Sequence, residues 1–283
     1  MKTRFNSEFE NDSTPSRLLI ERYRAALDEN ENDPDCSLGL VHYRGTREEL
    51  DLGLEYSHSP DPKDRITGAL VLAQLGWSDR IYLDESVDRL IELLSDEDPR
   101  VIHEAAAALG HRGDSRAMAY LLPLAAHPDA QIRYGTVFGL LGHEDDEAIA
   151  ALITLAGDPD EDVRDWAVFG LGSQIETDNA SIRQALWRAV DDTSSDVRGE
   201  ALVGLAKRRA PGVIDAIIRE WQDHEEIRGL SLEAAAEFPG FPEDGEFDTA
   251  DEQMPLEDYR ARLIAALEAC RPASLSTSRE PVD

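Results

Sequence analysis

Several kinds of residue are scarce in this chain. Its 283 residues include two cysteines, Cys36 and Cys270, and no C-x-x-C pair. This excludes a small disulfide-stapled fold and a cysteine-rich zinc site. The longest apolar stretch, residues 118–126, is about half of the roughly 20 residues that a membrane helix needs, and Pro123 interrupts it. The first residues contain no apolar run typical of a signal peptide. We therefore expect a cytoplasmic protein with no membrane partner.

Positive charge is also scarce, because 28 basic residues face 59 acidic ones and the formal net charge is −31. Only Lys2, Lys63 and Lys207 are lysines. A chain this acidic repels phosphate backbones, so we expect no nucleic-acid partner. The one basic run, residues 207–209, ends a predicted helix, where the helix dipole favours cations. The acidity favours a cationic protein partner, although solubility or a GC-rich or salt-adapted genome would also explain it.

One pattern recurs along most of the chain, as in "DPDEDVRDWAVFGLG" at residues 158–172. Each copy has an acidic start, often followed by proline, then a β-branched residue, small residues and a leucine. The β-branched residues lie 35, 31, 31, 34 and 30 residues apart, and they are Ile66, Val101, Ile132, Val163, Val197 and Ile227. A period of about 30–35 residues without alternating strand patterns indicates a helical solenoid.

Each copy predicts two helices. Pairs such as Asp61-Pro62 and Asp158-Pro159 suit the start of the first helix, because proline lacks only an N–H that has no partner there. Ile149, Leu152 and Ile153 show the helical spacing of a second helix. A two-helix unit cannot bury its apolar side alone, so neighbouring units must stack. The predicted fold is all-α, a right-handed α-solenoid of about six two-helix repeats with irregular capping ends.

Composition divides the chain into six segments. The polar start predicts disorder, the acidic Pro- and Gly-containing stretch after the repeats predicts a loop, and a final helix is expected to cap the stack. The segments are a disordered N-terminus at 1–15, a degenerate helical unit at 16–58, the repeats at 59–237, an acidic loop at 238–255, a capping helix at 256–270 and a disordered tail at 271–283.

The run of acidic residue, proline, acidic residue, Val-Arg, small residues and Leu-Gly resembles the HEAT repeats of the phycobilisome-lyase-like class. The resemblance covers residues 59–237, roughly two thirds of the chain. It implies the fold, and it suggests an accessory lyase or chaperone-like protein related to bilin lyases as one alternative function. The sequence shows no group of polar residues suited to hold a chromophore, and a shared repeat is an analogy of fold.

A metal enzyme is a second alternative, because HEAT-like deoxyhypusine hydroxylases hold iron with His-Glu pairs from several repeats. Here only His103-Glu104 matches that pattern, whereas another repeat has Gly199-Glu200. One pair cannot enclose a metal ion, which needs several converging ligands. We therefore expect no metal, no cofactor, no catalytic residue and no enzymatic activity. His103 is expected to make a hydrogen bond between repeats.

Arginine recurs one position after the β-branched residue, at Arg133, Arg164, Arg198 and Arg228, which we call the arginine ladder. The planar guanidinium makes several directed hydrogen bonds, so each arginine is expected to bind an acidic group or helix end of the adjoining repeat. Nearby candidates are Asp160, Asp162 and Asp196. A row that binds an anionic ligand is the alternative. We predict that Arg164→Ala lowers the melting temperature.

Six positions after the β-branched residue, apolar residues form a column that is expected to pack in the core. Its members are Leu72, Ala107, Phe138, Phe169 and Val203.

Two positions of the repeat vary freely, which is where a solenoid can encode specificity on a constant frame. They supply four candidate partner-binding residues: Tyr134, Asp165, Trp166 and Glu200. Aromatic residues are enriched at binding hot spots. Trp166 could instead fill space left by Gly135 in the preceding repeat.

The leading functional prediction is a monomeric, non-enzymatic adaptor that presents an acidic, curved surface to a basic protein. A related alternative is an immunity or inhibitor protein for a cationic toxin.

Overall fold

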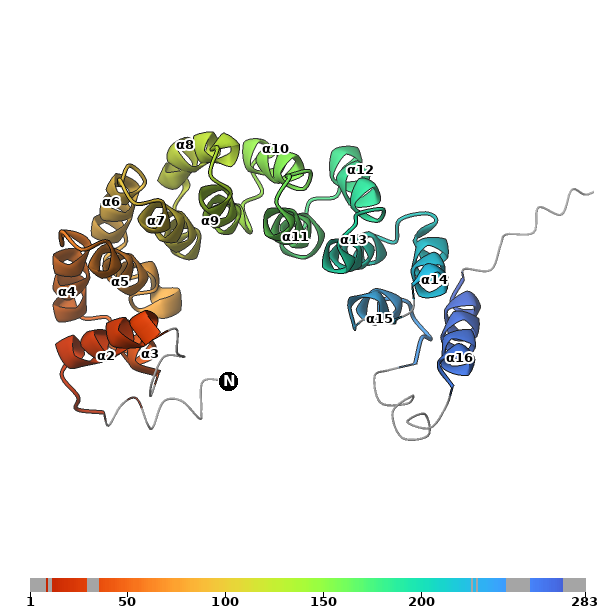
Figure 1. The fold of residues 1–283 in the computed structure, drawn as a ribbon, viewed down its shortest axis with the longest axis horizontal. Coiled ribbons are helices and arrows are strands. Elements are labelled where there is room, and N and C mark those ends of the chain that lie inside the picture. The colour runs from red at the N-terminus through yellow and green to blue at the C-terminus, as the bar shows by residue number, and fades with distance from the viewer. Residues whose placement is uncertain are drawn as a thin grey trace, which may run out of the picture. The chain divides into compact units, whose positions relative to one another are not determined.

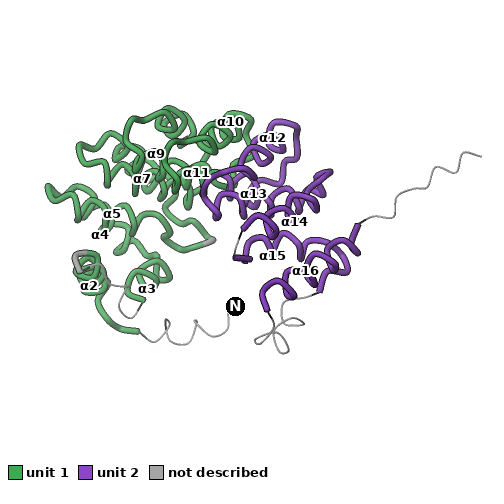
Figure 2. Tube along the Cα trace, turned by 45° about the vertical axis from the view of Figure 1, so that its right-hand side comes forward, with its two compact units in different colours: residues 1–167 green, residues 168–283 purple. Residues whose placement is uncertain are grey.

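The computed structural model describes residues 9, 12–29, 36–224, 226–227, 229–242 and 255–271. Within these residues the fold is all-α, with fifteen α-helices and no strand, which confirms the predicted fold class. The chain divides into two compact units, residues 1–167 and residues 168–283, which we call unit 1 and unit 2 (Figure 2).

Unit 1 is built from two layers of helices (Figure 1). The first helices of the repeats, α5, α7 and α9, pack side by side, and the second helices α6, α8 and α10 lie against them. The helices of unit 1 are α2 (Ser16–Glu29), α3 (Ser37–Arg44), α4 (Arg47–Ser57), α5 (Pro62–Ala73), α6 (Leu83–Leu93), α7 (Pro99–Arg112), α8 (Met118–Leu121), α9 (Ala130–Leu140), α10 (Asp146–Leu155) and most of α11 (Glu161–Phe169).

Aspartates start the first helices of unit 1. Asp61, Asp98 and Asp129 each accept a hydrogen bond from a backbone N–H in the first turn of α5, α7 and α9. Such caps satisfy donors that have no partner inside the helix. Proline follows the cap in α5, as predicted for Asp61-Pro62, and also in α7. The predicted helix start at Asp158-Pro159 was wrong, because α11 begins at Glu161.

The second helix that the repeat pattern predicts in the segment "DSRAMAYLLPLAA", residues 114–126, is not continuous. A 3₁₀ turn, η3 (Ser115–Ala117), precedes the short α8, and a second, η4 (Leu122–Ala126), follows it. Pro123 explains the break, because it has no backbone N–H for the helical ladder. The prediction of one helix here was wrong.

Two glycines bring α7 and α9 together in unit 1. A Cβ at Gly135 would lie 2.5 Å from the carbonyl oxygen of His103, and one at Gly139 would lie 2.8 Å from that of Ala106. Any larger residue would force the two backbones apart. The close approach fixes how neighbouring first helices stack, and it places their exposed residues side by side.

Unit 2 begins with a π-helical turn, η5 (Gly170–Gln174), that continues α11. Its helices are α12 (Ala180–Ala189), α13 (Ser195–Lys207), α14 (Val213–Asp223), α15 (Gly229–Ala236) and α16 (Leu256–Ala269). α13 packs against α12, α14 and α15, and α16 packs against α14. Gly172 also makes a close approach, since its Cβ would lie 3.1 Å from the Cα of Gly204.

The ends of the chain differ in part from expectation. Residues 12–15, expected within a disordered N-terminus, are held by Arg44, whose guanidinium pairs with Asp12 at 2.8 Å and donates to the Thr14 carbonyl at 2.7 Å. Most of the predicted acidic loop (243–254) and of the predicted tail (272–283) lies outside the described residues. Among the helices described, none has the length and apolar character needed to cross a bilayer.

Candidate protein-binding site

Four rings form a continuous row across three neighbouring first helices of unit 1. We call His103 of α7, Tyr134 and Phe138 of α9, and Trp166 of α11 the ring row. The imidazole of His103 stacks on Tyr134, with centroids 5.6 Å apart. Tyr134 meets Phe138 edge to face at 5.1 Å, and Phe138 lies 4.5 Å from Trp166. Tyr134 and Phe138 are four residues apart and therefore share one side of α9.

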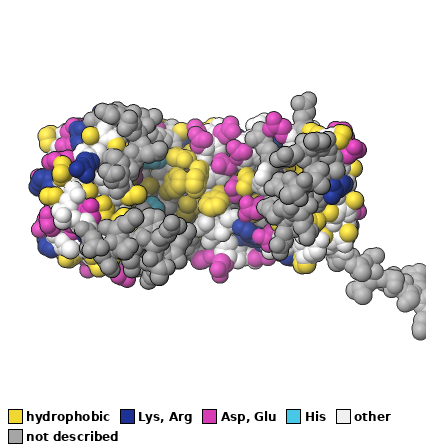
Figure 3. Space-filling model, turned by 90° about the horizontal axis from the view of Figure 1, so that it is seen from below, with side chains coloured by type: hydrophobic (Ala, Val, Ile, Leu, Met, Phe, Trp, Pro, Cys, Tyr) yellow, Lys and Arg dark blue, Asp and Glu magenta, His cyan; other side chains and the backbone are white. Residues whose placement is uncertain are grey.

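The ring row is at the surface. All four of its side chains are half-buried, whereas neighbouring α9 residues such as Ile132 and Val137 are buried. Figure 3 views the molecule from the side of the first helices and shows hydrophobic side chains gathered near the middle, with acidic side chains beside them. Aromatic rings exposed in one contiguous patch are typical of binding surfaces.

Two carboxylates act on Tyr134. Partial burial raises the pKa of its hydroxyl, and the negative charges of Asp162 and Asp165 raise it further. A hydrogen bond from the indole N–H of Trp166 opposes that shift. Asp162 is exposed and Asp165 is half-buried, both in the first part of α11. We call Asp162 and Asp165 the acidic pair.

The structure thus brings together three of the four predicted binding residues, Tyr134, Asp165 and Trp166. Glu200 lies on α13 of unit 2 and is half-buried. Three further residues of the patch were not among the predicted binding residues: His103, Phe138 and Asp162. The spacing of four residues between Tyr134 and Phe138 was a signal that could have found one of them.

Trp166 does not fill a space left by Gly135. The position that a Gly135 side chain would take is occupied by the His103 backbone, with three of its atoms within 2.9 Å. Trp166 instead packs on Phe138.

The apolar column is not uniformly core. Leu72 and Val203 are buried, but Ala107, Phe138 and Phe169 are half-buried. The prediction of core packing was wrong for these three residues. Each lies at the edge of the core, where neighbouring helices cover only part of its side chain.

The arginine ladder is structural where it is described. Arg133 binds both oxygens of Asp158 at 2.6 and 2.7 Å and donates to the His127 carbonyl at 2.9 Å. Arg198 binds Glu220 in the same two-pronged way, with two of its contacts at 2.9 Å. These guanidiniums are nearly buried, so they are not open to an anionic ligand.

For Arg133 and Arg198 the carboxylate partners differ from the predicted candidates Asp160, Asp162 and Asp196. Arg133 binds Asp158, and Arg198 binds Glu220. Arg164 donates to the Asp158 carbonyl at 3.0 Å. Arg228 lies outside the described residues.

Comparison with known proteins now decides the family. A family model described as HEAT repeats matches residues 51–141, 120–206 and 149–236, which together make up more than half of the chain. The chain belongs to the HEAT-repeat family. No curated protein matches it.

Two solved structures resemble this chain, and the first supports the HEAT-like fold. YibA of E. coli has a TM-score of 0.62 at 21% identity, with 94% of each chain covered. The complex of CpcE and CpcF of phycocyanin lyase from Nostoc sp. PCC7120 has a TM-score of 0.47 at 16% identity, covering 91% of this chain and 97% of that chain. At 21% identity the likeness to YibA shows the fold alone.

The HEAT repeats reveal a fifth ladder residue, Arg65. Counted from its N-cap Asp61, Arg65 occupies the place that Arg133 occupies after Asp129. It binds Asp96 with two contacts of 2.7 Å. The alignment of the repeats on their β-branched residues used Ile66 for the first repeat, and this shifted that repeat by two residues. The alignment therefore did not show that Arg65 is equivalent to Arg133.

One HEAT repeat has neither the ladder arginine nor the carboxylate that would bind it. Asp96 and Asp158 each lie two residues before the N-cap of the following first helix and accept its backbone N–H at 2.9 Å. In α7 the ladder position is Ile102, and the matching acceptor position is His127. The pairing therefore supports a structural role for the ladder.

A second arginine position clamps the ends of the HEAT repeats. Arg112 is fully buried and donates to the carbonyls of Leu75 at 3.1 Å and Ile81 at 2.6 Å. Arg208 holds the same place after the N-cap of α13, and it donates to the carbonyls of Leu171 and Ile175 at 2.8 and 2.7 Å. Both arginines tie a repeat to the one before it.

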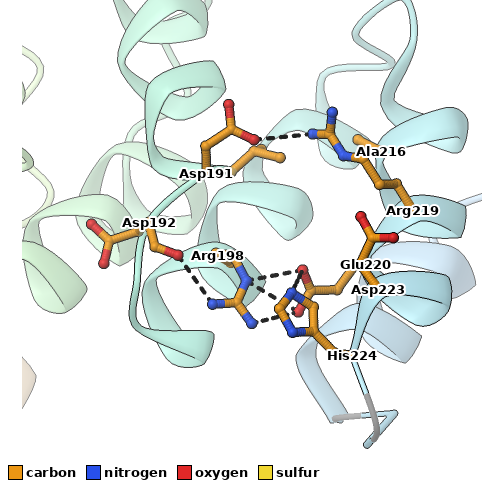
Figure 4. A pocket seen from close by; sticks show the side chains of 9 residues that line it. Asp191, Asp192, Arg198, Ala216, Arg219, Glu220, Asp223 and His224 are labelled. Atoms are coloured by element: carbon orange, nitrogen blue, oxygen red, sulfur yellow. Dashed lines mark hydrogen bonds and ion pairs between the residues drawn. The ribbon is translucent and has the colours of Figure 1, made fainter.

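Unit 2 contains a polar cavity of about 220 Å³ between α13 and α14 (Figure 4). Both of its arginines form ion pairs there: Arg198 with Glu220, and Arg219 with Asp191 at 3.2 Å. His224 lies 3.4 Å from Glu220. These pairs explain the cavity as part of the ladder, so it is a weaker candidate site than the ring row.

His103 makes the predicted hydrogen bond between repeats, since its Nδ1 lies 2.8 Å from the Gln131 carbonyl oxygen and donates to it. Burial raises the pKa of the adjacent Glu104. In the part of the chain that the structure describes, no three His, Cys, Asp or Glu side chains converge to form a metal site.

Proposed function

We propose that this HEAT-repeat protein is a non-enzymatic adaptor that binds a basic protein partner. The observation that carries the proposal is the half-buried ring row with the acidic pair beside it, at the surface of the first helices of unit 1. Rigid aromatic side chains supply contact area at low entropic cost, and acidic residues around them select a cationic surface. HEAT repeats commonly mediate protein binding, which supports the general class of function.

The net charge of −31 adds long-range attraction. Opposite charges steer a basic partner toward the surface and speed association, while the aromatic patch supplies short-range affinity. The adaptor would act by complementarity, with no chemical step.

Affinity capture from host lysate tests this proposal. Wild-type protein is compared with a Tyr134→Ala/Asp165→Ala variant and with a matched control, Tyr120→Ala/Glu147→Gln. The control removes an exposed ring of α8 and an exposed acid of α10, both in the second-helix layer. We expect one basic protein to be retained by wild type and control and lost from the ring-row variant. Capture of no basic protein at low salt would reject the proposal.

A further inference from the structure

The chemistry of the ring row selects among basic side chains. Its rings present flat surfaces at different angles, since the planes of Tyr134 and Phe138 cross at 83° and those of Phe138 and Trp166 at 46°. A planar guanidinium stacks on such surfaces, whereas an ammonium group has no flat face to offer. The rings alone therefore favour arginine over lysine.

Asp162 supplies the matching charge. Its carboxylate is exposed in the first turn of α11, and no described residue forms an ion pair or hydrogen bond with it. Its negative charge reaches Tyr134. A carboxylate binds a guanidinium with two parallel hydrogen bonds, a geometry that lysine cannot match.

Two nearby arginines of this chain are engaged by other groups. Arg133 is bound to Asp158, and Arg164 donates to the carbonyl oxygens of Asp158 and Pro159. The rings extend over α7, α9 and α11 in steps of 4.5–5.6 Å. Alternate side chains of an extended strand are separated by roughly 7 Å. Two such side chains of one partner segment would fit along the row.

We propose that the ring row and Asp162 form a subsite for arginine side chains of an extended segment in the partner protein. One guanidinium stacks on the rings near Trp166 and pairs with the Asp162 carboxylate. This inference rests on the proposed adaptor function and specifies which basic residue the adaptor selects.

Three labelled octapeptides test the subsite by fluorescence anisotropy. They are four repeats of Ser-Arg, the same peptide with lysine, and the same peptide with citrulline, which keeps the planar shape but has no charge. We expect the arginine peptide to bind about two- to fivefold more tightly than the lysine peptide, as cation–π contacts at an exposed site imply. The citrulline peptide should bind at least tenfold more weakly, because it cannot pair with a carboxylate.

Variants assign the selectivity to named residues. Trp166→Leu should remove the preference for arginine over lysine, and Asp162→Asn should weaken both cationic peptides. Tyr120→Ala/Glu147→Gln should leave all three affinities unchanged. If Trp166→Leu unfolds the protein, Trp166→Phe keeps a smaller ring, and the peptide series on wild type remains decisive.

The outcomes separate the two proposals. Equal binding of arginine and lysine peptides by wild type would overturn the subsite but leave the adaptor for a basic partner intact. Binding of neither cationic peptide at low salt would overturn the subsite, and retention of a basic protein in the capture experiment would then still support the adaptor.

Discussion

α9 of unit 1 and α13 of unit 2 share a frame but differ in the surface they present. Four residues after the N-caps Asp129 and Ser194, both helices have a ladder arginine that binds a carboxylate. One residue later, Tyr134 in α9 corresponds to Gly199 in α13. A Cβ at Gly199 would lie 2.6 Å from the Cβ of Leu230, so α15 takes the space that a ring would need. The ladder arginines, which both helices share, stabilise the packing of the repeats. The packing of the next helix determines whether a variable position has room for a large surface side chain.

Arg112 and Arg208, which bind backbone carbonyls of the preceding repeat, also differ between the two units. Arg112 in unit 1 is buried, and among the described residues no carboxylate pairs with it, so burial and the charge of Arg80 lower its pKa to about 10. Arg208 in unit 2 lies 3.8 Å from Asp178. The neighbouring His42 of unit 1 is also buried, so we expect this end of unit 1 to be sensitive to acid.

The largest expected effect comes from removing the ladder arginine of α9 in unit 1 and of α13 in unit 2. Arg133→Ala should lower the free energy of unfolding by about 3–5 kcal/mol, because it leaves the buried Asp158 carboxylate without its partner. Arg198→Ala should have an effect of the same order, because the Glu220 side chain is only 14% exposed. Chemical denaturation of the two variants measures the loss. Similar values would show that the ladder serves both units alike.

Arg100→Ala is the matched control for the ladder. The Arg100 side chain is 50% exposed and pairs with Asp98 at the surface, so its loss should cost about 1 kcal/mol or less. Ladder variants that match this small loss would show that their ion pairs do not stabilise the stack.

The next largest effect is a pH dependence of stability, which we expect in unit 1 and not in unit 2. Burial, and then the charges of His111 and Arg112, lower the pKa of His42 to about 4, although a hydrogen bond to the Leu70 carbonyl opposes this. The unfolded chain takes up a proton near pH 6.5, so unit 1 should lose stability as the pH falls from there toward 4. The loss should total about 3 kcal/mol. Hydrogen exchange at several pH values follows each unit.

His42→Gln tests the cause of that acid sensitivity. The glutamine amide keeps an N–H donor for the Leu70 carbonyl but does not titrate. This variant should remove most of the pH dependence of unit 1 in that range and leave unit 2 unchanged. An unaltered slope in the variant would assign the effect to another group.

A smaller effect tests the stacking that presents the ring row. Gly135→Ala should cost about 1–3 kcal/mol, because the added methyl group meets the His103 backbone. Gly157→Ala is the control, since its Cβ would meet nothing closer than 3.6 Å. Equal melting temperatures for both variants would mean that the α7–α9 contact adjusts without cost.

Much of the fold followed from sequence because its determinants are local. The cap Asp61 and the period of the β-branched residues are local features of the sequence, so they predicted the first helices and the all-α class. Pro123 was visible in the sequence too, but the broken helix around it was missed because the apolar spacing still fitted a helix.

The candidate site was only partly predictable. Tyr134, Asp165 and Trp166 were found because they stand at variable positions of the repeat. Phe138 was assigned to the core and Asp162 to the ladder, because sequence spacing does not show which side of a helix is covered by the next one. Phe138 lies beside Tyr134 on the same helix, whereas the place of Asp162 near Tyr134 depends on the packing of α11 against α9, about thirty residues away in the chain.

The sequence by itself determined the helical repeat, its caps and the positions of the ladder arginines, since these depend on spacing within one or two turns of helix. Only the tertiary structure decided which carboxylate each arginine binds and which rings meet. Those choices depend on close backbone approach at glycines such as Gly135 and on the side chains of the next helix, and packing of this kind has no fixed spacing in the chain.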